Sequence, residues 1–168
     1  MSFGRISLLA VCWALSAAHS PMLGQTDSQR TGCQHVMAKL LTVRTSQNCT
    51  SPVEFCAAGT ITGGGVVHGA TTAVVLGLVP AVGLPGIEPN STLSYAAERT
   101  IQTARGMLTL RLTGVFDTVR GEFSELERVT GGTGVFEGAR GTLWLIGTTS
   151  DGTTFTGDLI GEVCLIRQ

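Results

Sequence analysis

The stretch Val129–Thr142, VTGGTGVFEGARGT, places five glycines within fourteen residues. A dinucleotide-binding loop needs a glycine three residues after its second one, at the start of a helix. Here Gly132 and Gly134 are followed by Glu137 at that position, and no G-x-x-x-x-G-K-[ST] sequence occurs in the chain. The segment that follows, residues 142–147, alternates as a strand does. A nucleotide-binding loop is therefore excluded.

The same stretch is not a flexible linker, because Val135 and Phe136 interrupt its glycines with large apolar side chains. Glycine permits the backbone conformations that tight turns and strand bends require. We therefore expect a sharp turn between two strands, with Val135 and Phe136 fixing the turn to the core.

The composition is that of one globular domain. The chain has 168 residues, 43% hydrophobic and 14% charged, which is too apolar for disorder and too short for two full domains. Its formal net charge of -1 argues against nucleic-acid binding, which requires a basic surface. No G-x-S-x-G or H-E-x-x-H motif occurs, and we interpret His68, in the apolar segment VVHGA, as a structural residue. We expect neither a metal nor a cofactor.

Alternating apolar residues dominate the chain after residue 52. Leucines occupy every second position from Leu108 to Leu112, and Phe116 follows on the same face. Seven or eight such runs, joined by short turns and with hardly any helical pattern, predict a sandwich or a barrel. The proline-rich segment 78–90 is expected to be largely loop. A closed barrel of about eight strands has room inside for side chains or one small ligand.

The N-terminal residues indicate export. Arg5 precedes a short apolar run, Ile6–Ala14, and small residues follow, which is typical of a signal peptide over residues 1–18. Residues 19–52 are expected to form an N-terminal extension, and near-helical spacing after Cys33 predicts a short helix or cap in it. The β domain is expected over residues 53–168. We therefore expect a secreted or periplasmic protein with no membrane contact after signal cleavage.

Cysteine usage agrees with export. Signal removal discards Cys12 and leaves Cys33, Cys49, Cys56 and Cys164, an even number that indicates two disulfides. Three pairings can be drawn. We favour Cys33–Cys49, which would staple the extension, and Cys56–Cys164, which would join the first and last strands of the β domain. A metal site at Cys33 is disfavoured, because the C-x-x-C pairs of structural zinc sites are missing.

Residues Gly131–Gly141, GGTGVFEGARG, resemble the G-G-T-G-x-F-x-x-A-x-G signature of the allene oxide cyclase and dirigent barrel superfamily. The segment DGTTFTGDLIGEVC, residues 151–164, is similar to the closing hairpin of bacterial secreted relatives. The resemblance covers about residues 53–166. It implies an all-β fold, an eight-stranded antiparallel barrel with an apolar central cavity, often assembled as a homo-dimer or homo-trimer.

The resemblance is less informative about activity. Plant members of the superfamily guide phenoxy-radical coupling or cyclise a fatty-acid epoxide, and some bacterial relatives cyclise polyketides. No catalytic set of the plant families matches this chain, so no catalytic residue carries over.

Tyr95, Arg99, Glu125, Glu127 and Phe155 are the candidate ligand-binding residues. Alternation places Tyr95, the only tyrosine, on one strand face with Arg99. If that face is inward, Arg99 needs Glu125 or Glu127 as a partner, and such a pair could polarise a carbonyl or epoxide or orient a ligand. We favour the other interpretation, in which these charges are solvated on the exterior, because charged side chains usually lie at the surface.

These observations together predict a protein that binds a small apolar ligand inside a barrel. Two alternatives stay open: an isomerase or cyclase that holds a reactive apolar substrate in one conformation, and a structural, oligomer-forming surface protein. An interior filled by leucines would favour the structural alternative, and a roomy one with a buried Arg99–glutamate pair would favour the cyclase. Trp144, which alternates with leucines, is either an exterior aromatic at a subunit contact or a wall of the cavity.

Overall fold

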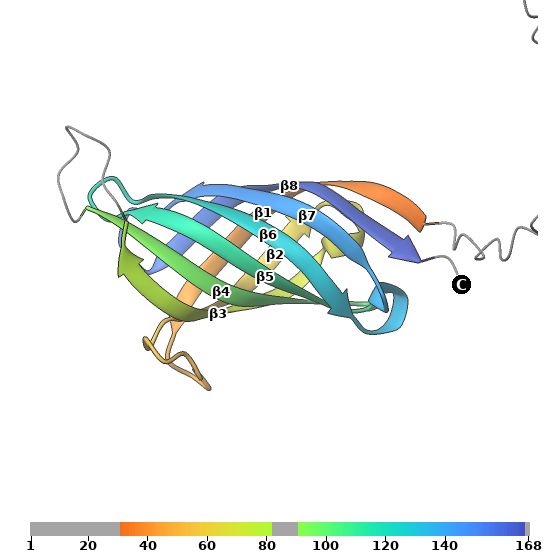
Figure 1. Ribbon diagram of the computed structural model, residues 1–168, viewed down its shortest axis with the longest axis horizontal. Coiled ribbons are helices and arrows are strands. Elements are labelled where there is room, and N and C mark those ends of the chain that lie inside the picture. The colour runs from red at the N-terminus through yellow and green to blue at the C-terminus, as the bar shows by residue number, and fades with distance from the viewer. Residues whose placement is uncertain (1–30, 82–90, 167–168) are drawn as a thin grey trace, which may run out of the picture.

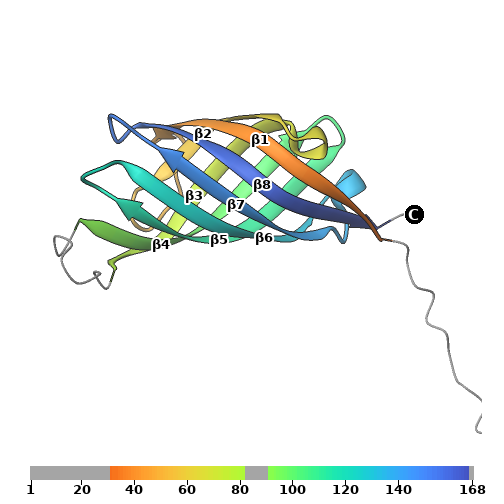
Figure 2. The same cartoon turned by 90° about the horizontal axis from the view of Figure 1, so that it is seen from above.

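The computed structural model describes residues 31–81 and 91–166. They form eight antiparallel strands, each paired with the next, and β8 pairs with β1 to close a barrel (Figures 1 and 2). The strands are β1 (Thr31–Thr45), β2 (Cys56–Gly63), β3 (Gly69–Pro80), β4 (Thr92–Thr103), β5 (Gly106–Asp117), β6 (Glu122–Gly132), β7 (Arg140–Thr148) and β8 (Thr154–Ile166). Two short 3-10 helices, η1 (Gly65–Val67) and η2 (Gly134–Phe136), follow β2 and β6. The expected eight-stranded antiparallel barrel is confirmed.

The barrel has two unlike ends. Both short helices lie at the end where β1 begins and β8 finishes, which we call the closed end (Figures 1 and 2). Val67 of η1 and Phe136 of η2 are fully buried there and pack into the main hydrophobic core. The β1–β2, β5–β6 and β7–β8 connections lie at the opposite end, called the open end. These two side chains therefore cover the barrel interior at the closed end.

The glycine-rich stretch forms the turn expected of it. β6 ends at Gly132, η2 follows directly, and β7 begins at Arg140. Gly134 has φ +62°, a left-handed conformation that glycine adopts readily. Phe136 is fully buried and Val135 packs against the same core, so both side chains fix the turn to the barrel.

The helix predicted after Cys33 is wrong, because this segment is strand β1 and the barrel begins at Thr31 rather than at residue 53. Val36, Ala38 and Leu40 point inward, as the period of two requires. Met37 and Leu41 are also apolar but lie exposed on the exterior. The sequence of this strand therefore does not alternate between apolar and polar residues. The predicted signal peptide and residues 19–30 lie outside the described residues.

The predicted disulfide pairing is also wrong. The bonds are Cys33–Cys164 and Cys49–Cys56. Because β1 closes the barrel against β8, their register places Cys33 directly opposite Cys164. Cys49 lies in the β1–β2 connection, and Cys56 is the first residue of β2. Two disulfides are compatible with an extracellular or periplasmic location.

The segment 78–90 was expected to be largely loop, but β3 continues as far as Pro80. Residues 82–90 lie outside the described residues.

Candidate ligand-binding cavity

A buried ion-pair network joins β4 to β6 inside the barrel. Arg99 Nη2 donates a hydrogen bond to Glu125 Oε2 at 2.7 Å, and Arg99 Nε donates to Glu127 Oε1 at 2.9 Å. Arg99 is 3% exposed and Glu127 is fully buried. The interpretation that we favoured from the sequence, solvated charges on the exterior, is therefore wrong. Arg99 alternates in phase with the buried residues Ala97 and Ile101, and that phase points it inward.

Tyr95 extends this network towards the open end. Its register partner on β5 is Gly114, and the register partner of Gly114 on β6 is Glu125. Because Gly114 has no side chain, the Tyr95 ring lies over it, and Tyr95 Oη donates to Glu125 Oε1 at 2.7 Å. Both carboxylate oxygens of Glu125 thus have donors.

Burial governs the protonation of the network. Desolvation of Glu127 raises the pKa of its carboxyl group to about 8, a shift that the Arg99 charge opposes and that Glu125 reinforces. When Glu127 is ionised, its Oε2 is a buried carboxylate oxygen with no hydrogen-bond partner among the described residues. The neighbouring Glu125 favours the protonated form of Glu127, in which the carboxyl group is a donor as well as an acceptor.

The cation of this network stays charged. Burial lowers the pKa of Arg99, but the negative charges of Glu127 and Glu125 outweigh this effect and hold the pKa above its ordinary value. Burial and the Glu125 carboxylate raise the pKa of Tyr95 well above its ordinary value. With Glu127 protonated, the network holds one positive and one negative charge, so its net charge is zero.

A cavity of about 80 Å³ lies beside this network at the open end. Three polar network members line it, Tyr95, Arg99 and Glu125, whereas Glu127 holds Arg99 from a position outside the lining. The remaining lining side chains are mostly apolar: Leu40, Thr42, Phe55, Ala57, Ala73, Val75, Leu78, Ala97, Phe116, Phe123 and Phe155. The cavity therefore combines an apolar wall with one charged corner.

Phe155 is the centre of the aromatic wall. Its ring makes edge-to-face contacts with Phe55, Phe116 and Phe123, at centroid distances of 5.8, 6.4 and 5.9 Å. The sequence pointed to Phe155 but not to the other three as ligand contacts. Phe116 lies on the alternating leucine face of β5, so alternation could have identified it. Phe55 lies in the β1–β2 connection, where its carbonyl oxygen accepts a hydrogen bond from the Val75 N–H. It is in phase with the buried residues Ala57 and Ile61, so alternation could have identified it as well.

Other candidates from the sequence lie away from this cavity. Trp144 is on the exterior of β7 and 49% exposed, so it is not a cavity wall. His68 is exposed after η1 and is not a buried structural residue. Within residues 31–81 and 91–166, no group of three His, Cys, Asp or Glu side chains could hold a metal ion. None of the helices in these residues is long and apolar enough to cross a membrane.

The fold and the site define a closed eight-stranded antiparallel barrel with a charged network buried beside an aromatic cavity at one end. Comparison of the chain with protein-family models, curated proteins and solved structures finds no match. Function must therefore be argued from the geometry of the site.

Proposed function

We propose that the protein binds a small, mainly apolar molecule with one oxygen acceptor in the cavity at the open end. The observation that carries this proposal is Arg99 Nη1. It is buried and has no hydrogen-bond partner among the described residues, on a side chain that lines a cavity rich in phenylalanine. Leaving a buried donor unpaired costs about 1–3 kcal/mol. A carbonyl, ether or hydroxyl oxygen on a ligand would remove this cost.

The charge balance of the network favours an uncharged ligand. Glu125 already accepts hydrogen bonds from Tyr95 and Arg99, and it balances the Arg99 charge when Glu127 is protonated. An anion would lie beside the Glu125 carboxylate and a cation beside the guanidinium, and either would bring an unbalanced charge into an apolar site. A neutral oxygen acceptor avoids both penalties.

The size of the cavity limits how much of the ligand it holds. At about 80 Å³ it is roughly half the volume of a 150 Å³ apolar cavity that admits benzene. We infer that the oxygen-bearing end of the ligand enters the cavity, between the phenylalanines that line it, and that the rest extends beyond the cavity at the open end. The two disulfides, together with the signal peptide expected from the sequence, support the further proposal that the protein acts outside the cytoplasm.

Isomerisation or cyclisation is the second candidate function. It is supported by the position of Arg99, which could stabilise negative charge developing on an oxygen in the cavity while the aromatic wall fixes the conformation of the substrate. The sequence resemblance to allene oxide cyclase and dirigent barrels supports the same chemistry. The structural alternative is supported only by the closed half, where leucines such as Leu108 and Leu159 fill the interior.

The proposal is tested with two ring compounds that differ only in the oxygen. Binding of cyclohexanone and cyclohexane to the mature protein is measured by NMR titration. We expect the ketone to bind about tenfold more tightly, which corresponds to about 1.4 kcal/mol. The preference should persist in Tyr95→Phe, which retains Arg99, and disappear in Arg99→Met that is shown by circular dichroism to be folded. Equal affinities in the wild type would refute the proposal.

Native mass spectrometry of the protein purified from its own host would identify a natural ligand that co-purifies with it. A co-purified uncharged molecule with an oxygen acceptor supports binding. Conversion of that molecule during incubation with fresh protein would instead establish the isomerase or cyclase.

A further inference from the structure

The seam between β1 and β8 carries exposed apolar side chains on the outside of the barrel. Met37 on β1 is directly opposite Ile160 on β8, and Ile160 is directly opposite Trp144 on β7. Met37 is 77% exposed and Trp144 49% exposed. Leu126 on β6 continues the row as the register partner of Trp144. Three adjacent strands therefore carry contiguous exposed apolar side chains, and the half-buried Leu126 extends the row. Such a row is typical of a protein interaction surface.

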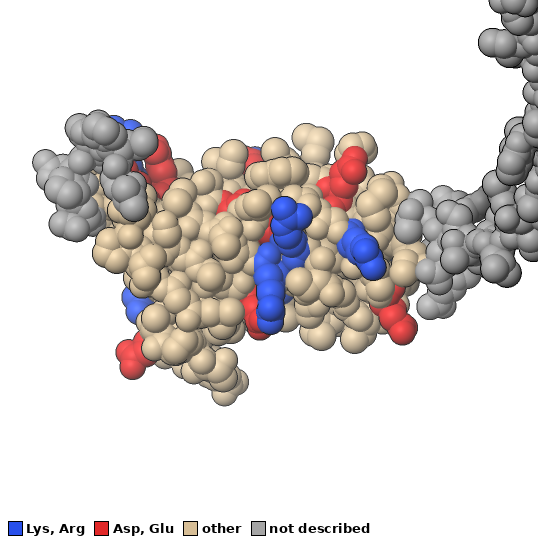
Figure 3. Space-filling model, viewed as in Figure 1, with Lys and Arg blue, Asp and Glu red and all other residues tan. Residues whose placement is uncertain are grey.

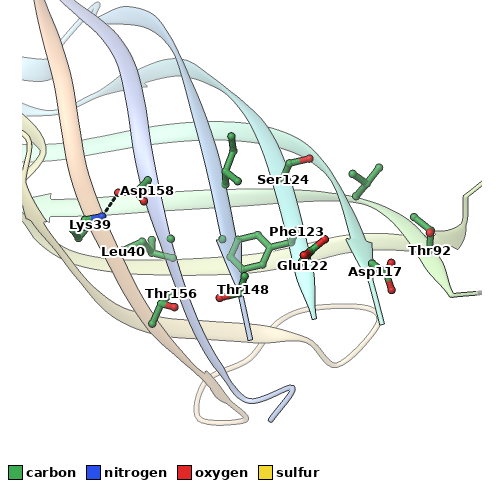
Figure 4. Close-up of a pocket in the computed structure, with 14 residues that line it drawn as sticks. Lys39, Leu40, Thr92, Asp117, Glu122, Phe123, Ser124, Thr148, Thr156 and Asp158 are labelled. Carbon is green, nitrogen blue, oxygen red and sulfur yellow. Dashed lines mark ion pairs between the residues drawn. The ribbon is translucent and has the colours of Figure 1, made fainter. Parts of the chain in front are cut away.

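The charges beside this apolar row follow a simple rule. On one side of the Met37–Ile160 pair, Lys39 of β1 is opposite Asp158 of β8, and the two form an ion pair (Figure 4). On the other side, His35 of β1 is opposite Glu162 of β8, with 3.2 Å between Nδ1 and Oε1. In both rows the basic side chain is on β1 and the acidic one is on β8. All four side chains are at least half exposed.

This arrangement is self-complementary about one axis only. A two-fold axis parallel to the strands, running along the seam, would place β1 of one copy over β8 of the other at the same height. Lys39 of each copy would then face Asp158 of the other, and Met37 would face Ile160. A two-fold axis across the strands would instead place Lys39 of each copy over His35 of the other, so that two basic side chains would face each other. Two-fold contacts use the same patch on both copies, so the patch must complement itself.

The β5–β6 seam, on another part of the barrel, does not share this property. On β5 and β6, Arg111 is directly opposite Arg128, so a two-fold axis along that seam would bring like charges together. Lys and Arg side chains gather near the middle of the face shown in Figure 3. From these observations we propose that the protein associates as a two-fold symmetric dimer through the outer face of the β1–β8 seam. An outer groove of about 840 Å³, which Lys39, Asp158 and Ile146 help to line, lies beside the seam and can receive side chains of the second copy (Figure 4).

Reversing the charges of Lys39 and Asp158 tests the dimer without touching the barrel interior. The mature wild type and the variants Lys39→Asp, Asp158→Lys and the double exchange are compared by analytical ultracentrifugation, after circular dichroism has verified folding. We expect a wild-type dimer, at least tenfold weaker association in each single variant, and recovery in the double exchange. Ile160→Glu should give a monomer, and Ile61→Val, buried in the core, serves as a control that leaves association unchanged.

Mixing experiments distinguish this axis from any other. The wild type and the double exchange should each form dimers, but native mass spectrometry of an isotopically labelled mixture should show few mixed dimers, because like charges would then face each other. A wild-type monomer at ~100 µM, far above the dissociation constants of specific complexes, would overturn the proposal. So would a trimer, single variants that associate as the wild type does, mixed dimers in statistical proportion, or a monomer that binds zwitterionic lipid vesicles through Met37 and Trp144. Because the ligand cavity is not involved, these results do not depend on the proposed ligand.

Discussion

Tyr95 and Glu125 are on strands separated by β5, yet Tyr95 Oη lies 2.7 Å from Glu125 Oε1, because Gly114 leaves room between them. A methyl group on Gly114 would lie 2.5 Å from Tyr95 Cζ and 2.7 Å from Oη. Gly114→Ala should therefore displace the ring, break the hydrogen bond and reduce stability by about 1–3 kcal/mol.

The titration of Tyr95 reports this displacement directly, since it is the only tyrosine in the chain. In Gly114→Ala the pKa of the phenol should fall towards its ordinary value, as followed by ultraviolet absorbance. Gly77→Ala is the control, because no atom lies within 4 Å of a methyl group placed there. An unchanged Tyr95 titration in Gly114→Ala would show that the glycine is not what admits the ring.

Arg99 and Arg111 provide a matched pair of arginines on opposite faces of the sheet. Arg99→Met leaves two buried carboxyl groups without their cation and should cost about 3–5 kcal/mol of unfolding free energy. Arg111→Met removes an exposed ion pair with Glu98, with 3.0 Å between Nη2 and Oε1, and should cost less than about 1 kcal/mol. Urea denaturation measures both, and similar losses would contradict the buried network.

Glu127 should make the protein less stable as the pH rises. Its pKa is raised by burial from 4.5 in the unfolded chain to about 8 in the folded one, so the folded state binds the additional proton between these values. The free energy of unfolding should be largest below about pH 4.5, as far as Glu127 contributes, and should decline up to about pH 8. Glu127→Gln cannot ionise and should lack this decline. Parallel pH profiles for the two proteins would refute the assignment.

The two disulfides should contribute unequally to stability. Cys33–Cys164 spans 131 residues and Cys49–Cys56 spans 7, and the unfolded chain loses more conformational entropy when a long loop is closed. Replacing Cys33 and Cys164 by alanine should cost about 2–3 kcal/mol more than replacing Cys49 and Cys56. Thermal and urea unfolding measure the difference. Non-reducing peptide mapping verifies the bonds, and a Cys56–Cys164 peptide would contradict them.

Gly134→Val should prevent folding rather than remove an activity. The backbone at Gly134 has φ +62°, which is strained for valine. A Cβ at this position would also lie 2.4 Å from the carbonyl oxygen of Arg105. Gly65→Ala separates the backbone strain from the steric clash. Gly65 has a similar φ of +59°, but no atom lies within 4 Å of a Cβ placed there. We expect Gly65→Ala to be soluble with a loss of about 1–2 kcal/mol, and Gly134→Val to be insoluble or unfolded. A folded Gly134→Val protein without ligand binding would reverse this interpretation.

Local sequence determined much of the fold. The leucines at every second position of β5 and the glycine-rich turn before β7 each act over a few residues, so their strand and turn conformations could be predicted from the sequence. The dependence on local pattern also explains why a helix was wrongly predicted for the segment that forms β1. Apolar residues such as Met37 also occupy the exterior face of β1, so apolar and polar residues do not alternate along this strand. Local sequence does not show which of its apolar side chains are buried.

Tertiary structure alone decided the disulfides and the site. Closure of the barrel made β1 the neighbour of β8 and so placed Cys33 beside Cys164, a contact between the two ends of the described chain. Local alternation places Arg99 and Glu127 each on one face of its strand, but the direction of that face depends on how all eight strands close. Burial then provides the partners and raises the pKa of Glu127, since desolvation acts on a group only after the surrounding strands have excluded water.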